Sequence, residues 1–303
     1  MNKKYIAPYV ALVVGVVSVS CAAIFVKLAG STPASIIANY RLLLAVLLMT
    51  PYILLTKRYQ EFKHISKRDF LLSACAGVFL AFHFIFWFES LQYTSVASSV
   101  VLVTMQPIFA FLGTYFFFHE RFSFGAIVSM FLAILGSIII SWGDFQISGL
   151  ALLGDILALL GAIMMTGYFL LGQSVRQRLS LGTYTYVVYG ISAITLIVYN
   201  IILKQEFSGY SWNLWFIFLA LAIIPTFLGH SLFNYSLKWI STSTISMAML
   251  FEPVGASILA YIVLHEQLTW SQILGGSIVI IGLLIFSLST SKTVAISKNE
   301  EEI

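Results

Sequence analysis

Ten apolar segments of about twenty residues each follow one another along the 303-residue chain, separated by short connectors. They cover residues 7–27, 35–55, 70–90, 96–118, 123–142, 150–172, 182–203, 213–236, 242–264 and 270–290. Unpaired backbone groups are costly in lipid, so a segment that crosses a bilayer is either a helix or a strand of a closed barrel. Because the segments show no period-two alternation, we expect ten transmembrane helices and an all-α polytopic membrane protein.

The composition agrees with a chain that resides in lipid. Hydrophobic residues make up 60% of the sequence and charged residues only 9%, whereas about a quarter of residues are charged in an average soluble protein. The net charge of +4 does not indicate a nucleic-acid partner, because the lysines and arginines form no basic stripe. Cys21 and Cys75 lie inside apolar segments, with neither CxxC nor Cys/His spacing. We therefore expect membrane lipid around the protein and no metal ion or other cofactor.

The basic residues also indicate which way the chain crosses the membrane, because short cytoplasmic loops are enriched in Lys and Arg. With the N-terminus in the cytoplasm, the loop 56–69 and almost all other basic residues lie on the cytoplasmic side. The exceptions are Lys27, Arg41 and Lys204. An even number of spans returns the C-terminus to that side, where residues 292–303 form a solvated tail. We expect a multi-pass protein of the cytoplasmic membrane with both termini in the cytoplasm.

An internal repeat becomes visible when the chain is compared with itself at an offset of 146 residues. Identical residues then meet at Ser90 and Ser236, Pro107 and Pro253, Tyr115 and Tyr261, His119-Glu120 and His265-Glu266, and Gly136 and Gly282. We therefore predict two homologous halves, residues 1–145 and 146–291. Each half has five spans, and because five is odd the second half is inverted in the membrane. Inverted repeats are typical of secondary carriers, although duplication also enlarges membrane proteins that transport nothing.

Short motifs within these halves follow an order typical of one family. They are Ala23-Ile24-Phe25-Val26-Lys27, Tyr40-Arg41-Leu42, Gln106-Pro107 and His119-Glu120-Arg121 in the first half, and Phe251-Glu252-Pro253-Val254 and His265-Glu266-Gln267-Leu268 in the second. Over nearly its whole length the sequence resembles the EamA-type transporters of the drug/metabolite transporter superfamily. It departs from their pattern at His119 and His265, where Gly is usual. The resemblance implies a ten-helix carrier, often an exporter of amino acids or other metabolites, with the substrate in a central cavity between the halves.

Two prolines at equivalent places point to a binding site halfway through the membrane. Pro107 and Pro253 each remove one backbone donor near the middle of a span, so each helix should be kinked and locally opened there. Interrupted spans at corresponding positions of two repeats are the best sequence pointer to a carrier's site. A polar residue precedes each proline, Gln106 in the first half and Glu252 in the second. These two side chains are the first candidates for contact with the solute.

Glu252 has two open interpretations. A carboxylate about ten residues into a span is expensive to keep ionised in hydrocarbon, and acidic residues at such depth usually have a function. Glu252 could bind an amine of the substrate or relay a coupling proton. Alternatively, it is a neutral acid that hydrogen-bonds to the carbonyl freed by Pro253 and so closes the gap in the helix.

Three further candidate sets have alternatives of the same kind. Arg41 and Glu89 lie at similar depth near the outer ends of the second and third spans, so a pair between them could gate the outer mouth or brace two helices, or Arg41 could receive a substrate carboxylate. Helical spacing places His83 and Trp87 on one face of the third span together with Ser90. The eighth span has a similar polar edge at His230 and Asn234. Each edge either lines the substrate cavity or packs against helices or lipid.

Together these features predict a secondary carrier that exports a small amphipathic metabolite, such as an amino acid, by alternating access. The sequence contains no GxxxxGK[ST] loop for ATP, so the energy should come from a gradient, for example of protons, or from a partner. The alternative from another class is an integral-membrane enzyme that acts on a lipid or isoprenoid substrate. The sequence has no HExxH or GxSxG motif and no paired membrane aspartates, so we expect no enzymatic activity. A channel and a scaffold are two other possibilities.

Overall fold

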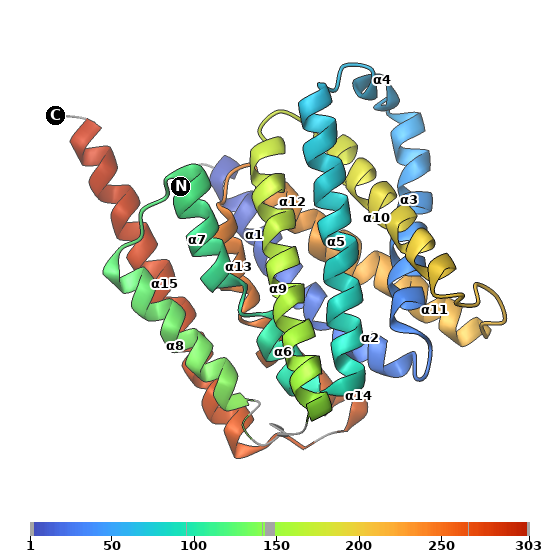
Figure 1. The fold of residues 1–303 in the computed structure, drawn as a ribbon. Coiled ribbons are helices and arrows are strands. Elements are labelled where there is room, and N and C mark those ends of the chain that lie inside the picture. The colour runs from blue at the N-terminus through green and yellow to red at the C-terminus, as the bar shows by residue number, and fades with distance from the viewer. Residues whose placement is uncertain (1–2, 95, 141, 143–148, 266, 302–303) are drawn as a thin grey trace.

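A computed structural model describes residues 3–94, 96–140, 142, 149–265 and 267–301 of the chain. The regular elements in these ranges are helices packed into one bundle (Figure 1). The first half contains α1 (Lys3–Ser20), α2 (Ala22–Leu28), α3 (Ala34–Leu55), α4 (Tyr59–Phe62), α5 (Lys67–Tyr93), α6 (Val96–Val103), α7 (Gln106–Phe118) and α8 (Phe124–Ile140). The second half contains α9 (Gly149–Val175), α10 (Leu181–Ile202), α11 (Trp212–Leu221), the π-helix η1 (Ala222–Ser231), α12 (Leu232–Ser236), α13 (Thr242–Met249), α14 (Glu252–Leu264) and α15 (Trp270–Glu301). The predicted boundary between the halves, at residues 145 and 146, lies outside the described residues, as does Glu266.

The spans predicted from hydropathy are confirmed as helices. In the described ranges, nine helical segments are long and apolar enough to cross a membrane, from Ile6–Leu28 to Trp270–Ser289. The remaining predicted span is α8, an apolar helix of 17 residues. At the C-terminal end, α15 continues as a helix to Glu301 through most of the expected tail. Extending an existing helix adds one hydrogen bond for each residue fixed, so a polar continuation is not costly.

The two halves interlock through equivalent contacts. α1 packs against η1 and α12, which belong to the third span of the second half, and against α13 and α14 of its fourth span. In the same way, α9 packs against α5 and against α6 and α7, the third and fourth spans of the first half. The second spans, α3 and α10, pack on each other, and so do the fifth spans, α8 and α15. Each contact of one half with the other thus has a counterpart in which the roles of the halves are interchanged. This pattern agrees with two repeats related by an axis in the membrane plane.

α8 and α15 lie together at one edge of the bundle, far from α10 and α11 (Figure 1). Their backbones approach closely, because a Cβ added to Gly136 would lie 2.7 Å from the carbonyl oxygen of Gly275. A Cβ added to Gly282 would lie 2.9 Å from the Cβ of Ala133. Small residues allow such close contact between transmembrane helices. The last spans of the two halves are thereby packed backbone to backbone.

The outer faces and the interior of the bundle differ in polarity. Large apolar side chains are exposed on the outside, among them Leu55, Phe117 and Trp270. Polar side chains are buried between the helices, and Arg41 is among the largest fully buried side chains. Burying a polar group is costly unless it has partners or a function. The buried polar side chains are therefore the candidates for the functional site.

Candidate functional site

The fourth span is interrupted at Pro107. α6 ends at Val103 and α7 begins at Gln106, so that Pro107 occupies the first turn of α7. Pro107 has no N–H group to donate to the carbonyl oxygen of Val103, four residues earlier. The side-chain amide of Gln106 takes this role, because its Nε2 donates to that oxygen at 3.1 Å. The Oε1 atom of Gln106 stays buried and unpaired.

The ninth span is interrupted at the equivalent place. α13 ends at Met249, and α14 begins at Glu252, directly before Pro253. A carboxyl group thus occupies the position that the Gln106 amide has in the first half, and the Glu252 side chain is buried. An amide always carries donor hydrogens, whereas a carboxyl group donates only while it is protonated. The two halves share a backbone interruption here but differ in proton chemistry.

A third interruption, in the eighth span, was not predicted. Pro225 stands inside the span Trp212–Ser236 and leaves the carbonyl oxygen of Leu221 without its usual donor. The chain forms the π-helix η1 here, and the Thr226 hydroxyl donates to that oxygen at 2.9 Å. Turns of π-helix are frequent at functional sites. The proline was visible in the sequence, but its equivalent at the repeat offset is Phe79, so the comparison of the halves did not reveal it.

Thr226 also holds the side chain of Arg41, which comes from α3. The Arg41 Nε donates to the Thr226 hydroxyl oxygen at 2.8 Å. The guanidinium carbon lies 4.3 Å from the centroid of the Phe84 ring. The side chain is fully buried, and neither Nη1 nor Nη2 has a hydrogen-bond partner.

The ion pair expected between Arg41 and Glu89 is not formed. Arg41 instead contacts Thr226 and Phe84. Glu89 follows Trp87 by two residues, which places it about 200° around α5 from the face that Trp87 occupies. A similar depth in the membrane does not bring two side chains together when they lie on different faces of their helices.

The third-span face with His83 and Trp87 is turned inward. Both side chains are buried, and their rings are stacked with centroids 5.7 Å apart. The Nδ1 of His83 lies 2.9 Å from the carbonyl oxygen of Gly161. Because a carbonyl only accepts, Nδ1 carries the hydrogen in the neutral ring, and Nε2 remains an acceptor. Because both side chains are buried between helices, this face does not contact lipid.

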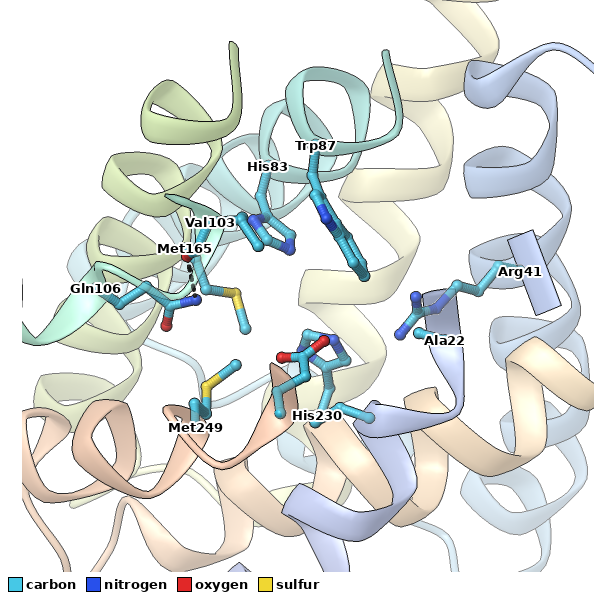
Figure 2. A pocket seen from close by; sticks show the side chains of 11 residues that line it. Ala22, Arg41, His83, Trp87, Val103, Gln106, Met165, His230 and Met249 are labelled. Atoms are coloured by element: carbon cyan, nitrogen blue, oxygen red, sulfur yellow. Dashed lines mark hydrogen bonds between the residues drawn. The ribbon is translucent and has the colours of Figure 1, made fainter. Parts of the chain in front are cut away.

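Residues from both halves line one small cavity (Figure 2). They are Val19, Ala22, Arg41, His83, Trp87, Val103 and Gln106 from the first half, and Met165, His230, Met249 and Glu252 from the second. Six of the seven side chains that the sequence suggests for solute binding are among them. Arg41 approaches from one side, and Gln106 lies on the opposite side together with Met165 and Met249 (Figure 2). The free space between the side chains holds no more than about one water molecule.

Asn234, the seventh candidate, is not among the lining residues but belongs to a buried polar network beside the cavity. Its Nδ2 donates to the Tyr168 hydroxyl at 2.6 Å, and the Tyr189 hydroxyl lies 3.0 Å from that of Ser231. The Nε of Arg176 donates to the backbone oxygen of Asn234 at 2.8 Å. The two tyrosines were not predicted, because a hydropathy pattern counts Tyr with the apolar residues and their hydroxyl partners come from another span.

Several lining side chains retain unused hydrogen-bonding capacity. Buried atoms without a partner are Nη1 and Nη2 of Arg41, Nε1 of Trp87, Oε1 of Gln106 and Nδ1 of His230. Such atoms are rare in folded proteins, because each costs about 1–3 kcal/mol. These polar atoms line the same cavity as the thioethers of Met165 and Met249. The combination suits a small molecule with a polar end and an apolar body. Within the described ranges, no group of three or more His, Cys, Asp or Glu side chains is arranged to hold a metal ion.

Polar contacts join the two halves where α5 begins and α9 ends. The Oδ1 of Asp69 accepts from Arg178 at 2.6 Å. Glu61 accepts from the backbone N–H of Ser180 at 2.9 Å and from the Thr183 hydroxyl at 2.6 Å. Partial burial of Glu61 opposes ionisation, but these hydrogen bonds outweigh it and lower the pKa of the Glu61 carboxyl below its ordinary value.

The sequence profile of one family matches both halves of the chain. That of the EamA-like transporter family matches residues 6–142 and again residues 152–288. The chain belongs to the EamA-like transporter family. The expected family, the two repeats and the all-α membrane fold are thereby confirmed. EamA-like membership also makes the protein a multi-pass membrane transporter and not an enzyme.

Two relatives from Bacillus subtilis (strain 168) are named as transporters. The chain is 25% identical over 297 residues to "Uncharacterized transporter YdfC", covering 96% of this chain and 94% of that protein. It is 27% identical over 196 residues to "Uncharacterized transporter YxxF", covering 64% of this chain and 62% of YxxF, so the match spans less than two thirds of that relative. A solved structure described as "Crystal structure of protein" shares the fold, with a TM-score of 0.78, 14% identity, and coverage of 93% of this chain and 96% of that chain.

Proposed function

We propose that this EamA-like transporter is a secondary carrier that exports a small amphipathic solute, such as an amino acid, across the cytoplasmic membrane by alternating access. The cavity between the halves is the observation that carries the proposal. Both halves contribute side chains to it, and residues at or beside the interruptions of four spans line it. Irregular backbone at membrane depth is tolerated where it is buried or lines a cavity, and interrupted helices at a repeat interface are typical of carrier sites.

The lining of the cavity supports an amphipathic cargo. Arg41, His83 and Gln106 offer polar groups, while Met165 and Met249 offer flexible thioethers that adapt to apolar bodies of different shapes. The free space admits roughly one water molecule, so a solute enters only when the halves move apart. Alternating access therefore requires forms of the protein in which this cavity is wider and open to one side of the membrane.

The basic residues support an orientation with both termini in the cytoplasm. In this orientation the contact between Asp69 and Arg178 lies at the cytoplasmic end of the bundle, as do those of Glu61 with Ser180 and Thr183. These contacts join one half to the other. Opening toward the cytoplasm must therefore break them, and a solute that binds the open form must supply the difference in free energy.

Efflux from cells tests the carrier function. Cells with and without the protein are loaded with labelled amino acids and related metabolites, and the medium is also compared by untargeted mass spectrometry. We expect one chemical class to leave faster from cells with the protein, with saturation, and to show counterflow in proteoliposomes. Saturable movement without counterflow would contradict alternating access, and unsaturable movement would favour a channel. No movement of any solute would leave a scaffold as the better explanation.

A further inference from the structure

Arg41 enters the cavity with most of its hydrogen-bond donors unused. A guanidinium group has five N–H donors. The donor on Nε binds Thr226, and those on Nη1 and Nη2 have no partner among the described residues. An unpaired donor that carries charge is more costly to bury than a neutral one. A group that binds these atoms therefore recovers more free energy here than at a surface arginine.

Two contacts hold the guanidinium plane in a fixed direction. Thr226 accepts from Nε, and the Phe84 ring lies beside the guanidinium carbon at 4.3 Å. Thr226 is itself tied to the carbonyl oxygen of Leu221. Figure 2 shows the Arg41 side chain directed toward Trp87 and His230. The free Nη edge is thus oriented before any ligand arrives, which lowers the entropy cost of binding.

The ionisable groups around Arg41 come from five other elements. They are His83 of α5, Tyr168 of α9, Tyr189 of α10, His230 of η1 and Glu252 of α14. Glu252 is the acidic member of this set. In the described ranges, ion pairs join Arg58 to Glu61 and Arg178 to Asp69, and Arg41 takes part in neither. The Nη edge is therefore open to an anion from outside the protein.

We propose that Arg41 is the receptor for an oxyanion of the cargo, a carboxylate or a group of similar size and charge, which binds Nη1 and Nη2 in a two-point contact. The proposal rests on the carrier function. Two parallel N–H donors match the two oxygens of a carboxylate in spacing and direction. The rest of the cargo then extends across the cavity toward Gln106, Met165 and Met249 (Figure 2).

This assignment makes charge the basis of selection. A carboxylate brings a negative charge directly to the Nη donors of Arg41, whereas an amine, an ester or an amide of the same size leaves these donors without an anionic partner. A site built around polar contacts rejects analogues that lack the matching group much more strongly than an apolar pocket does. We expect the carrier to prefer an acid over its methyl ester by about tenfold or more, corresponding to about 1.4 kcal/mol.

The test starts from the compounds that the efflux comparison finds in the medium of cells with the full-length protein. We expect these compounds to carry a carboxylate or another oxyanion. Arg41→Gln should lower their export about tenfold or more. Arg41→Lys keeps the charge but not the two-point fork, so it should raise KM more than it lowers the maximal rate. Arg68→Gln makes the same chemical change at an exposed position of α5 and should leave export unchanged.

Thermal unfolding of the purified protein separates loss of binding from loss of the fold. The exported acid should raise the Tm of the wild-type protein, and its methyl ester should not. Arg41→Gln should purify as a monodisperse species that neither compound stabilises. If that variant does not fold, the acid and ester are compared on the wild-type protein and on Arg41→Lys, and a smaller acid effect in Arg41→Lys supports the proposal.

Three results would overturn the assignment and leave the carrier function intact. They are export of compounds without any anionic group, equal stabilisation of the wild-type protein by acid and ester, and unchanged export by Arg41→Gln. If cells with the protein export no compound at all, the carrier function fails, and the assignment of Arg41 fails with it.

Discussion

At the scale of single residues, the cavity depends on side chains that replace missing backbone donors. Gln106 donates to the carbonyl oxygen that Pro107 leaves free, and Thr226 donates to the one that Pro225 leaves free. Both side chains have a second role, because Gln106 lines the cavity and Thr226 orients Arg41. The polar residues beside these interruptions are thus needed to complete the helices and are also in reach of a solute.

Glu252→Gln is the residue-scale test of proton coupling. The substitution places in the second half the amide that the first half has at Gln106. An amide has the same shape but does not release a proton, so we expect normal membrane insertion and the loss of any dependence of transport on a pH gradient. Transport is measured in proteoliposomes with and without that gradient.

Glu89→Gln provides the matched control for this test. Glu89 is a half-buried acid of α5 that is not among the residues lining the cavity. Its replacement should leave the coupling as it is in the wild-type protein. Coupling that persists in Glu252→Gln would remove Glu252 from the proton path, and coupling lost equally in both variants would show a general effect of removing acids.

At the scale of elements, four spans consist of shorter helices or contain a π-helical segment near the cavity. The junctions between α6 and α7 and between α13 and α14 lie at equivalent places of the repeat, η1 interrupts the eighth span, and the first span is divided between α1 and α2. Two short helices joined by an irregular junction can change their mutual angle at a lower cost than one continuous helix can bend. These junctions are therefore the places where we expect the spans to change shape during transport.

Pro253→Ala tests the need for one of these junctions. The substitution restores a backbone donor, so one continuous helix becomes possible through the ninth span. We expect a more stable protein, by about 1 kcal/mol for one regained hydrogen bond, and slower transport. Thermal unfolding and transport rates are measured on the same preparations. Pro51→Ala, at an exposed position of α3, is the control and should leave transport unchanged. A stabilised Pro253→Ala that transports at the full rate would show that the junction is dispensable.

The elements differ in how well the sequence predicts them, and the range of the interactions explains the difference. The spans and the junctions near Pro107 and Pro253 follow from local hydropathy and from prolines at repeated positions. The roles of Tyr168 and Tyr189 depend on donors and acceptors in other spans, which no local pattern contains. One of the two interpretations of Arg41, a pair with Glu89, is not seen in the structure for the same reason, since depth in the membrane is local information and the relative orientation of two helices is not.

At the scale of the whole molecule, hydrogen bonds and an ion pair connect the two halves where α5 begins and α9 ends. Asp69 with Arg178, and Glu61 with Ser180 and Thr183, bridge residues more than a hundred positions apart in the chain. The contacts lie outside or at the margin of the spans, where water weakens each of them. A set of weak contacts suits an end of the molecule that must open and close repeatedly.

The pH dependence of stability tests one of these contacts. A carboxyl group with a lowered pKa in the folded state contributes stability above the ordinary Glu pKa of about 4.3, and this contribution is lost as the pH falls through the lower folded-state value. The Tm difference between the wild-type protein and Glu61→Gln should therefore be largest near neutral pH and shrink below about pH 4.3. Thr183→Val removes one donor and should reduce the same difference. A difference that stays constant across this range would contradict the account.

The close seam between α8 and α15 determines where a rocking motion can take place. Of the residues described at the cavity, none comes from α8 or α15, and Gly136 and Gly275 leave no room between the two backbones. Separating these two helices would break close backbone contacts without widening the cavity. We therefore expect α8 and α15 to stay packed on each other while the rest of the bundle rotates about them. In a rocking motion about this seam, each of the other eight spans would move farther the greater its distance from that edge of the molecule.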